Sequence, residues 1–178
     1  MIVPKGLGVA LATPFTDDGS LDTDALARLV RGVTRGRAAF LGGPRSARRA
    51  RELAAPATAQ AVAWTQRARE LGAHGTLVVV PPYVKPSQQG LIAHFAAVAD
   101  AAPDRAVVLY NVPGRAATNL LPATLASLWR LPNVVAVKES SGDLQQIARI
   151  AAELPPGKVL LAGDDALALP SIAADALG

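Results

Sequence analysis

The sequence contains no cysteine, and this absence excludes several kinds of site at once. Disulfide bonds, zinc-thiolate centres and thiol nucleophiles all require cysteine sulfur. Aromatic residues make up only 4% of the chain, and no stretch approaches the roughly 18 uninterrupted apolar residues that a membrane-spanning helix needs. We therefore expect no membrane association, and a cytoplasmic location is the default prediction.

The excess of positive charge comes from one segment of an otherwise mildly acidic chain. The net charge is +4, but six arginines and no acidic residue lie within residues 35–51. Phe40 is the only aromatic residue among them, whereas surfaces that stack nucleic-acid bases interleave aromatic and basic side chains. We interpret residues 35–55 as an atypical arginine-rich segment and predict no nucleic-acid partner.

The rest of the chain alternates apolar stretches of strand length with stretches of helical periodicity. With 51% hydrophobic residues, the 178 residues can form one domain around a substantial core. Strands are expected at residues 6–12, 77–80, 106–112, 134–139 and 158–163, and helices at 22–33, 56–72, 87–102, 121–130, 143–153 and 165–176. Asp22 is the expected cap of the first helix, and the expected inner face of the second consists of Ala61, Trp64, Ala68 and Leu71.

Two parallel α/β architectures fit this alternation, a barrel and an open doubly wound sheet. A dinucleotide-binding sheet requires a glycine-rich turn between strand and helix, and the nearest string, GLGVAL at 6–11, lacks its third glycine. In a (β/α)₈ barrel the catalytic groups lie at the carboxyl ends of the strands. Unusual polar residues occur at those positions here, namely Thr13, Tyr83, Tyr110, Lys138 and Asp164. The sequence therefore favours a TIM-type barrel.

Lys138 ends the apolar stretch VVAVK, and a charged side chain there is explained if it points into a site. A desolvated lysine retains neutral amine, the species that attacks a carbonyl to form a Schiff base. Tyr110 ends the preceding strand, within reach of a proton transfer to that lysine. Arg115 offers a guanidinium to a substrate carboxylate. Taken singly, each residue also has a structural explanation: a lysine or arginine extended into solvent, and a half-buried tyrosine.

Five strings, in this order and spacing, resemble the dihydrodipicolinate synthase and N-acetylneuraminate lyase family. They are GVALATPF at 8–15, PPYVKPSQQGLIAHF at 81–95, YNVPGR at 110–115, VVAVKESSGD at 134–143 and LLAGDDA at 160–166. The resemblance covers residues 6–34 and 56–178, and it implies a class I, pyruvate-dependent aldolase on an incomplete TIM barrel formed by the single domain 1–178. In having an arginine after YNVPG, the chain resembles the dihydrodipicolinate synthase branch of the family.

By this resemblance, Lys138 forms the Schiff base with pyruvate, Tyr110 relays protons and Arg115 receives the carboxylate of L-aspartate 4-semialdehyde. The product is then 4-hydroxy-tetrahydrodipicolinate, on the route to lysine. Tyr83 matches the tyrosine that in this family completes a proton relay across a subunit interface, which implies a homo-oligomer. An imine on lysine is itself an electron sink, so we expect no metal and no organic cofactor. His74 and His94 are interpreted as structural.

The chain departs from the family pattern between Val33 and Pro56. The GTTGE-type loop that binds the pyruvate carboxylate in the family does not occur there. We therefore expect the second β-α unit and the third strand to be degraded or missing, and the eighth unit and the C-terminal helices to be absent. Two alternatives stay open: a pyruvate-dependent aldolase of the neuraminate lyase type that takes another aldehyde, and a catalytically silent truncated relative.

Overall fold

The computed structural model describes residues 14–20, 22, 24, 25, 28, 41, 42 and 50–177. In these residues the chain forms a sheet of six strands in the order β1-β2-β3-β4-β5-β6, and every neighbouring pair is parallel. The strands are β1 (Leu41–Gly42), β2 (Ala50–Leu53), β3 (Gly75–Val79), β4 (Ala106–Asn111), β5 (Val134–Glu139) and β6 (Val159–Ala162). The predicted parallel α/β architecture is confirmed.

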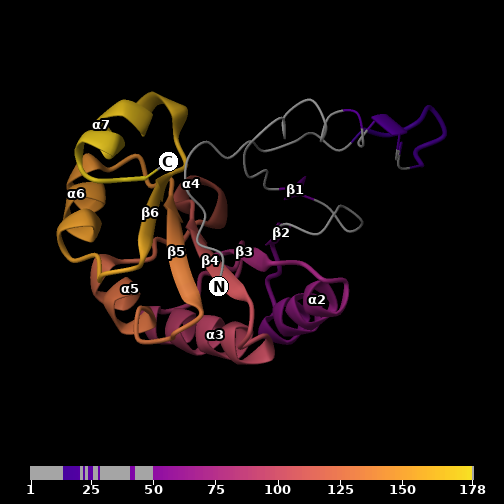
Figure 1. Cartoon of the computed structure of the whole chain (residues 1–178), viewed down its shortest axis with the longest axis horizontal. Helices are drawn as coiled ribbons and strands as arrows, with labels where there is room; N and C mark the ends of the chain where they lie inside the picture. The colour runs from indigo at the N-terminus through magenta and orange to yellow at the C-terminus, as the bar shows by residue number, and fades with distance from the viewer. Residues whose placement is uncertain are drawn as a thin grey trace.

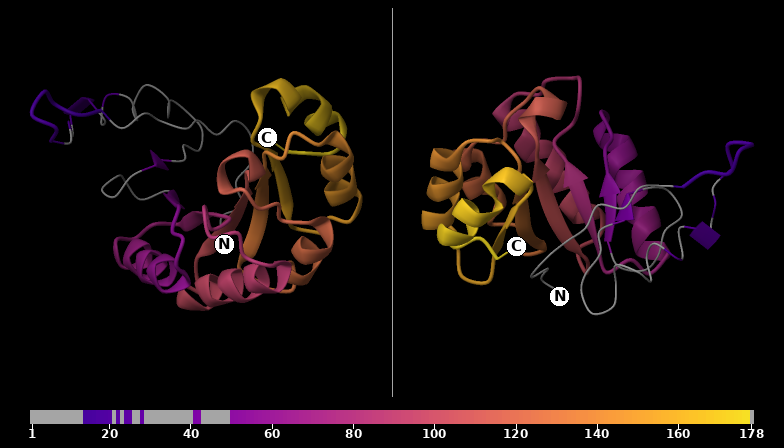
Figure 2. Two further views of the ribbon diagram at one scale, coloured as in Figure 1. Left: turned by 180° about the vertical axis from the view of Figure 1, so that it is seen from behind. Right: turned by 90° about the horizontal axis from the view of Figure 1, so that it is seen from above.

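Helical segments follow each strand from β2 onward, and the longer ones lie along the outer side of the sheet. They are α2 (Thr58–Glu70), α3 (Gln88–Ala101), α4 (Pro113–Ala116), α5 (Pro122–Leu128), α6 (Leu144–Ala152), η1 (Asp165–Leu167) and α7 (Ala168–Ala173). Figure 1 shows α2, α3, α5, α6 and α7 as an arc around the strands, and Figure 2 shows the same arc from behind and from above. An arc of helices around parallel strands is the geometry of part of a barrel wall.

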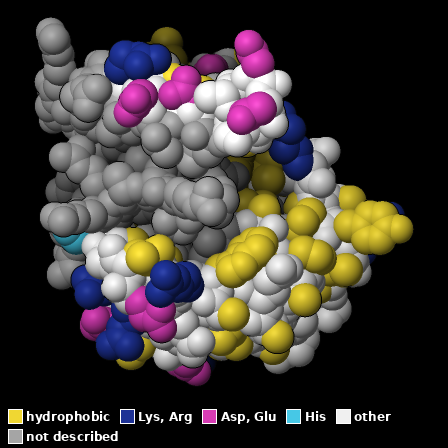
Figure 3. Space-filling model, turned by 90° about the vertical axis from the view of Figure 1, so that its right-hand side faces the viewer, with side chains coloured by type: hydrophobic (Ala, Val, Ile, Leu, Met, Phe, Trp, Pro, Cys, Tyr) yellow, Lys and Arg dark blue, Asp and Glu magenta, His cyan; other side chains and the backbone are white. Residues whose placement is uncertain are grey.

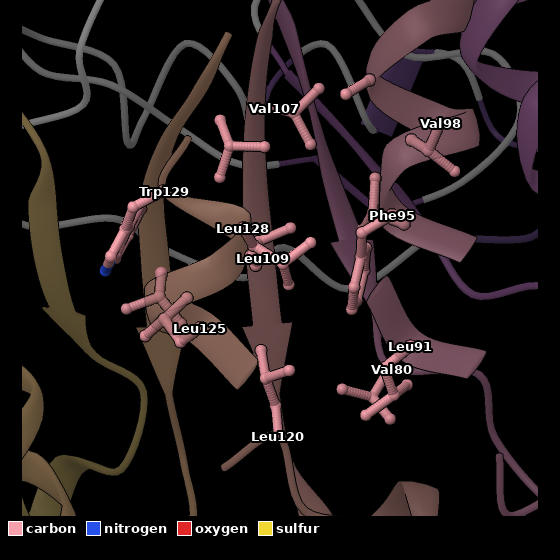
Figure 4. Packing of buried hydrophobic residues seen from close by; sticks show 14 of the residues in the cluster. Val80, Leu91, Phe95, Val98, Val107, Leu109, Leu120, Leu125, Leu128 and Trp129 are labelled. Atoms are coloured by element: carbon pink, nitrogen blue, oxygen red, sulfur yellow. The ribbon is translucent and has the colours of Figure 1, made fainter. Parts of the chain in front are cut away.

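Hydrophobic side chains bury both faces of this sheet. On the helix side, Phe95 and Val98 of α3 point toward Val107 and Leu109 of β4 (Figure 4). On the other face a second cluster consists of Leu77, Ala106, Val108, Val135, Ala136, Val159 and Leu161. Strands covered on both faces have continuous apolar sequences, which is why β4 and β5 were predicted to within one residue.

The helix starts follow local capping rules. Ser87 precedes α3 and its hydroxyl accepts from the backbone N–H of Gly90 at 3.1 Å. Asp143 precedes α6 and accepts from the N–H groups of the next helical residues. Asp22, the predicted first cap, accepts from the N–H of Ala25 at 2.8 Å. Each cap satisfies a donor that has no partner within its own helix.

The inner face of α2 differs in part from the expectation. The inner face of α2 consists of Ala61, Thr65 and Ala68, whereas Trp64 and Leu71 are 40% and 45% exposed. Small side chains at this spacing let α2 approach its neighbours closely, so the bulky Trp64 lies on the flank. Figure 3 faces the side where α2 lies and shows hydrophobic side chains gathered over part of the described surface.

The second β-α unit and the third strand were expected to be degraded or missing in the segment 35–55, and the structure has only the two short strands β1 and β2 there among its described residues. Strand β2 pairs with β3 over four positions, from Ala50 with Gly75 to Leu53 with Val78. The expected strand at 6–12 and the polar residue Thr13 lie outside the described residues. In the part of the chain that is described, no helix is long and apolar enough to cross a membrane.

Candidate active site

The ends of β4, β5 and β6 bring the predicted polar residues together. Tyr110 of β4 is paired in register with Lys138 of β5, and Asn111 with Glu139 one residue further on. The hydrogen-bond ladder continues past the strands, because the N–H of Ser140 donates to the carbonyl of Asn111 at 2.8 Å. Side chains alternate between the two faces of a strand, so Tyr110 and Lys138 share one face and Asn111 and Glu139 the other.

The side chains of Lys138 and Tyr110 are in contact. The Nζ atom of Lys138 lies 4.2 Å from the centroid of the Tyr110 ring, and both side chains are half-buried. A lysine ammonium group over the face of an aromatic ring is attracted by the ring quadrupole. This contact holds the amine at the carboxyl end of the sheet.

A pocket of about 620 Å³ opens beside this pair. It is lined by Tyr110, Val112, Gly114, Arg115, Ser140, Gly163, Asp164 and Asp165. Arg115 comes from α4, a single turn whose N–H groups at Arg115 and Ala116 both donate to the carbonyl of Val112 at 2.9 Å. Proline at the first helical position has a backbone φ already suited to that turn. The pocket therefore combines an arginine, two carboxylates and a phenol.

Gly163 makes room for the lysine. A Cβ atom at this position would collide with the hydroxyl of Ser140 and lie 3.0 Å from both Cγ and Cε of Lys138. The Oγ atom of Ser140 is buried and has no hydrogen-bond partner among the described residues. The end of β6 thus approaches the end of β5 more closely than any residue other than glycine allows.

Tyr83 lies apart from the pocket. It follows β3 in an exposed loop, with 90% of its side chain accessible, and its backbone φ is +73°. A positive φ is unusual for a bulky residue and is found where the surrounding structure imposes it. Within the described residues, Tyr83 does not contribute to the lining shared by Tyr110 and Arg115.

Lys158 is the lysine whose environment is most strongly desolvating, yet its geometry is structural. Burial lowers the pKa of Lys158 below its ordinary value of 10.5. Its Nζ donates to the carbonyls of Leu131 and Val134 at 3.1 and 2.5 Å, at the start of β6 and away from the pocket. Because its donors are already used by the backbone, Lys158 is not a candidate nucleophile.

Comparison with known proteins assigns the chain to a family. Residues 52–178 match the model of the dihydrodipicolinate synthetase family. The chain belongs to this family. The match contains β3 to β6 with the pocket, so the strand ends described above are those of a dihydrodipicolinate synthetase-type chain.

Individual relatives support the same family. The 4-hydroxy-tetrahydrodipicolinate synthase of Thermosynechococcus vestitus is 50% identical over 121 residues, which are 68% of this chain and 41% of that protein. The crystal structure of dihydrodipicolinate synthase from Aquifex aeolicus has a TM-score of 0.89 and 33% identity, covering 98% of this chain and 68% of that one. A dihydrodipicolinate synthase from Acinetobacter baumannii complexed with pyruvate has a TM-score of 0.88 and 29% identity, with 98% and 68% covered. The chain thus aligns with about two fifths of the length of the curated relative.

The predicted TIM-type barrel class, incomplete in this chain, is confirmed by these dihydrodipicolinate synthase structures. Sequence reasoning singled out Lys138, Tyr110, Arg115 and Asp164, and the structure brings them together. It missed Ser140 as part of the pocket wall. A serine in the string KESSGD gives no signal of its own, since only the turn after β5 aims its hydroxyl at Gly163.

The two histidines lie in different environments. His94 is 4% exposed on α3, and its Nδ1 lies 2.9 Å from the hydroxyl of Thr58 on α2. Burial lowers the pKa of His94 below 6.5, because the charged ring would lose its hydration. His74 is exposed just before β3. Among the described residues, no group of three histidine, cysteine or acidic side chains could hold a metal ion.

Proposed function

We propose that the chain catalyses the dihydrodipicolinate synthase reaction, the condensation of pyruvate with L-aspartate 4-semialdehyde to 4-hydroxy-tetrahydrodipicolinate. The observation that carries the proposal is the contact between the Lys138 Nζ atom and the ring of Tyr110, which lines a pocket together with Arg115. The relative from Acinetobacter baumannii was solved with pyruvate, which supports pyruvate as the first substrate.

Lys138 is the proposed nucleophile. Its neutral amine adds to the ketone carbon of pyruvate, water is lost, and a carbon–nitrogen double bond forms. The resulting cationic imine withdraws electrons from the neighbouring methyl group, which then loses a proton and becomes a carbon nucleophile. This enamine attacks the aldehyde carbon, and the aldehyde oxygen takes up a proton to become the hydroxyl group. The amine of the former semialdehyde then adds to the imine carbon, which closes the ring and expels Lys138 as the free amine. The chemistry requires neither a metal ion nor an organic cofactor.

Tyr110 is the proposed proton carrier. It occupies the register position opposite Lys138, and adding and losing water both require proton transfers beside that amine. A hydroxyl held in place by a strand end performs such transfers without reorganisation of solvent. Tyr110 therefore transfers protons during formation and breakdown of the imine on Lys138, and does not contact the carboxylate end of the aldehyde substrate.

Arg115 is the proposed anchor for the carboxylate of the aldehyde substrate. Its guanidinium is exposed and faces the pocket from α4, and the planar group of arginine forms paired hydrogen bonds with a carboxylate. This position favours an aldehyde that carries a carboxylate over a neutral sugar aldehyde.

Assembly completes the proposal. Tyr83 is exposed and outside the pocket of its own chain, so its hydroxyl joins a proton relay only if another copy of the chain packs against it. We propose a cytoplasmic homo-oligomer in which Tyr83 of one copy serves a neighbouring site.

The test is the intact mass of the chain after incubation with pyruvate and sodium borohydride, which reduces an imine to a stable amine. One pyruvyl adduct per chain is expected, and Lys138→Ala should abolish it. Lys85→Ala is the matched control, since Lys85 is an exposed lysine in the loop after β3. An unmodified wild-type chain that is soluble and folded would overturn the proposal, as would an adduct that persists in Lys138→Ala.

A second measurement separates the aldehyde step. Arg115→Ala should form the pyruvyl adduct at the wild-type rate but lose most of the condensation with aspartate semialdehyde. Equal loss of both reactions would show that Arg115 serves pyruvate instead. Full condensation in the variant would contradict its proposed role.

A further inference from the structure

A buried polar network lies directly behind the candidate active site, on the opposite face of the same strand ends. Its centre is the carboxylate of Glu139, which is 1% exposed. The side-chain amide of Asn111 donates to both carboxylate oxygens at 3.1 and 3.0 Å. The backbone N–H of Ser141 donates to the same carboxylate at 2.7 Å. Glu139 and Asn111 are the chain neighbours of Lys138 and Tyr110.

The network extends to the segment that follows Arg115. Asn111 also donates to the side-chain oxygen of Asn119 at 2.7 Å, and its own oxygen accepts from the N–H of Leu120 at 2.9 Å. These bonds close the loop between Asn111 and Leu120 into a compact unit. Since α4 lies within this loop, the position of Arg115 is tied to the end of β4.

The start of α6 forms the other side of the network. The side chain of Gln146 is 7% exposed, and its amide pairs with that of Asn119 through two hydrogen bonds of 2.8 and 3.1 Å. Gln146 also donates to Glu139 at 3.4 Å. One set of hydrogen bonds thus joins the ends of β4 and β5, the loop carrying Arg115 and the first turn of α6.

If this network served packing alone, burying its polar groups would cost more free energy than burying apolar side chains in the same space. Within residues 54–177, no lysine or arginine forms an ion pair with Glu139, so amides and a backbone N–H balance its charge. Apolar side chains would fill the same space without the cost of removing a carboxylate from water. Polar groups with several fixed bonds do fix geometry, because each bond restricts both distance and direction.

We propose that Glu139 and Asn111, with Asn119 and Gln146, form a positioning network that holds Lys138, Tyr110 and Arg115 in their reacting arrangement. This inference rests on the proposed function. Each active-site residue is next to, or in a loop closed by, a network residue, and none of the four network residues lines the pocket. The network acts on the strand ends and not on substrate.

The test places two carboxylates in the network and then removes one. Asn111→Asp sets a second carboxylate against Glu139, and like charges at hydrogen-bond distance repel. Adding Glu139→Gln recreates one amide and one carboxylate with their positions exchanged. The readout is the rate of pyruvyl adduct formation with borohydride, with the maximal rate and the half-saturating pyruvate concentration measured separately.

We expect Asn111→Asp to lower the maximal rate at least about tenfold, because displacements of about 1 Å in an active site can cost ~100-fold. Half-saturating pyruvate should change much less, since no network residue touches the pocket. The exchanged double variant should recover most of the rate. Glu153→Gln, the same carboxylate-to-amide change at the exposed end of α6, is the matched control and should react like the wild type.

The outcomes separate the two proposals. No adduct in the wild type overturns the proposed function, and the positioning role with it. A reactive wild type beside a folded Asn111→Asp variant of unchanged rate overturns the positioning role alone. If Asn111→Asp does not fold, the exchanged variant decides: folded and fast supports the network, folded and slow overturns it.

Discussion

At the residue scale, the tightest steric requirement in the site is at Gly163. A methyl group there would collide with the Ser140 hydroxyl and press on Cγ and Cε of Lys138 from 3.0 Å. We predict that Gly163→Ala slows pyruvyl adduct formation by about tenfold or more, since the lysine must leave its place over Tyr110. Adding Ser140→Gly should restore part of the rate by removing the nearest obstacle.

Gly114 supplies the matched control for that experiment. It lines the same pocket, but a Cβ atom there would meet nothing within 4 Å. Gly114→Ala should therefore react at the wild-type rate in the same borohydride assay. Equal rates for Gly163→Ala and Gly114→Ala would contradict the prediction, because they would mean that the end of β6 shifts to make room for the added methyl group without disturbing Lys138.

His94 gives a second residue-scale prediction, on pH dependence. Burial lowers its pKa below 6.5 in the folded chain, so the unfolded chain binds more protons near that pH and stability declines as pH falls. The contribution is intact above about 6.5 and is lost as pH passes down through the lower, folded pKa. Urea unfolding from pH 7.5 to 5 should show this decline.

In a His94→Gln variant, that part of the pH dependence should disappear, whatever the variant's stability at pH 7.5. An identical slope in the variant would assign the decline to other groups. The hydrogen bond to Thr58 links α2 and α3, so loss of the ring is expected to lower stability at pH 7.5, where the ring is neutral.

The residues of the site were predictable to different degrees for a physical reason. Lys138 and Tyr110 are conspicuous in sequence, because a charged or phenolic side chain ends an apolar strand. Glu139 and Asn111 follow them directly and look like ordinary polar residues after a strand. Their pairing depends on the register of β4 with β5 across 28 residues of sequence, which no local pattern encodes.

At the scale of elements, α6 depends on the residue that precedes it. Asp143 accepts from the N–H groups of Gln145 and Gln146 at 2.9 and 3.2 Å. Removing this cap in Asp143→Ala should lower the free energy of unfolding by about 0.5–2 kcal/mol, measured by urea denaturation. Asp143→Asn keeps an acceptor oxygen and should lose much less; equal losses would mean that the cap bonds contribute little.

Strands were predicted more accurately than helix faces. β4 and β5 are buried on both sides, so their apolar sequences end where burial ends. The predicted inner face of α2 was right for Ala61 and Ala68 but wrong for Trp64, because periodicity alone does not show that only small side chains fit there. β1 and β2 went unpredicted because their sequences, with only two and four residues, carry no strand pattern and their pairing is with β3 and each other.

At the scale of the whole molecule, the proposed role of Tyr83 would tie activity to assembly. Its side chain is 90% exposed on a backbone with φ of +73°, and in the described part of the chain it lies outside the pocket. If Tyr83 serves the site of a neighbouring copy, the hydroxyl is useful only in the oligomer. Proton transfer by a positioned side chain contributes roughly 100-fold or more to a rate.

We therefore predict that Tyr83→Phe lowers condensation of pyruvate with aspartate semialdehyde at least about tenfold, and that the wild type falls to the same level when diluted until its copies separate. Specific activity and sedimentation velocity, measured over one concentration series, test this. Once dissociated, the Tyr83→Phe variant and the wild type should have equal activity, because Tyr83 of a separated chain has no neighbouring site to serve. Wild-type activity that stays constant through dissociation would place the function of Tyr83 within its own chain, since the loss caused by Tyr83→Phe would then be independent of assembly.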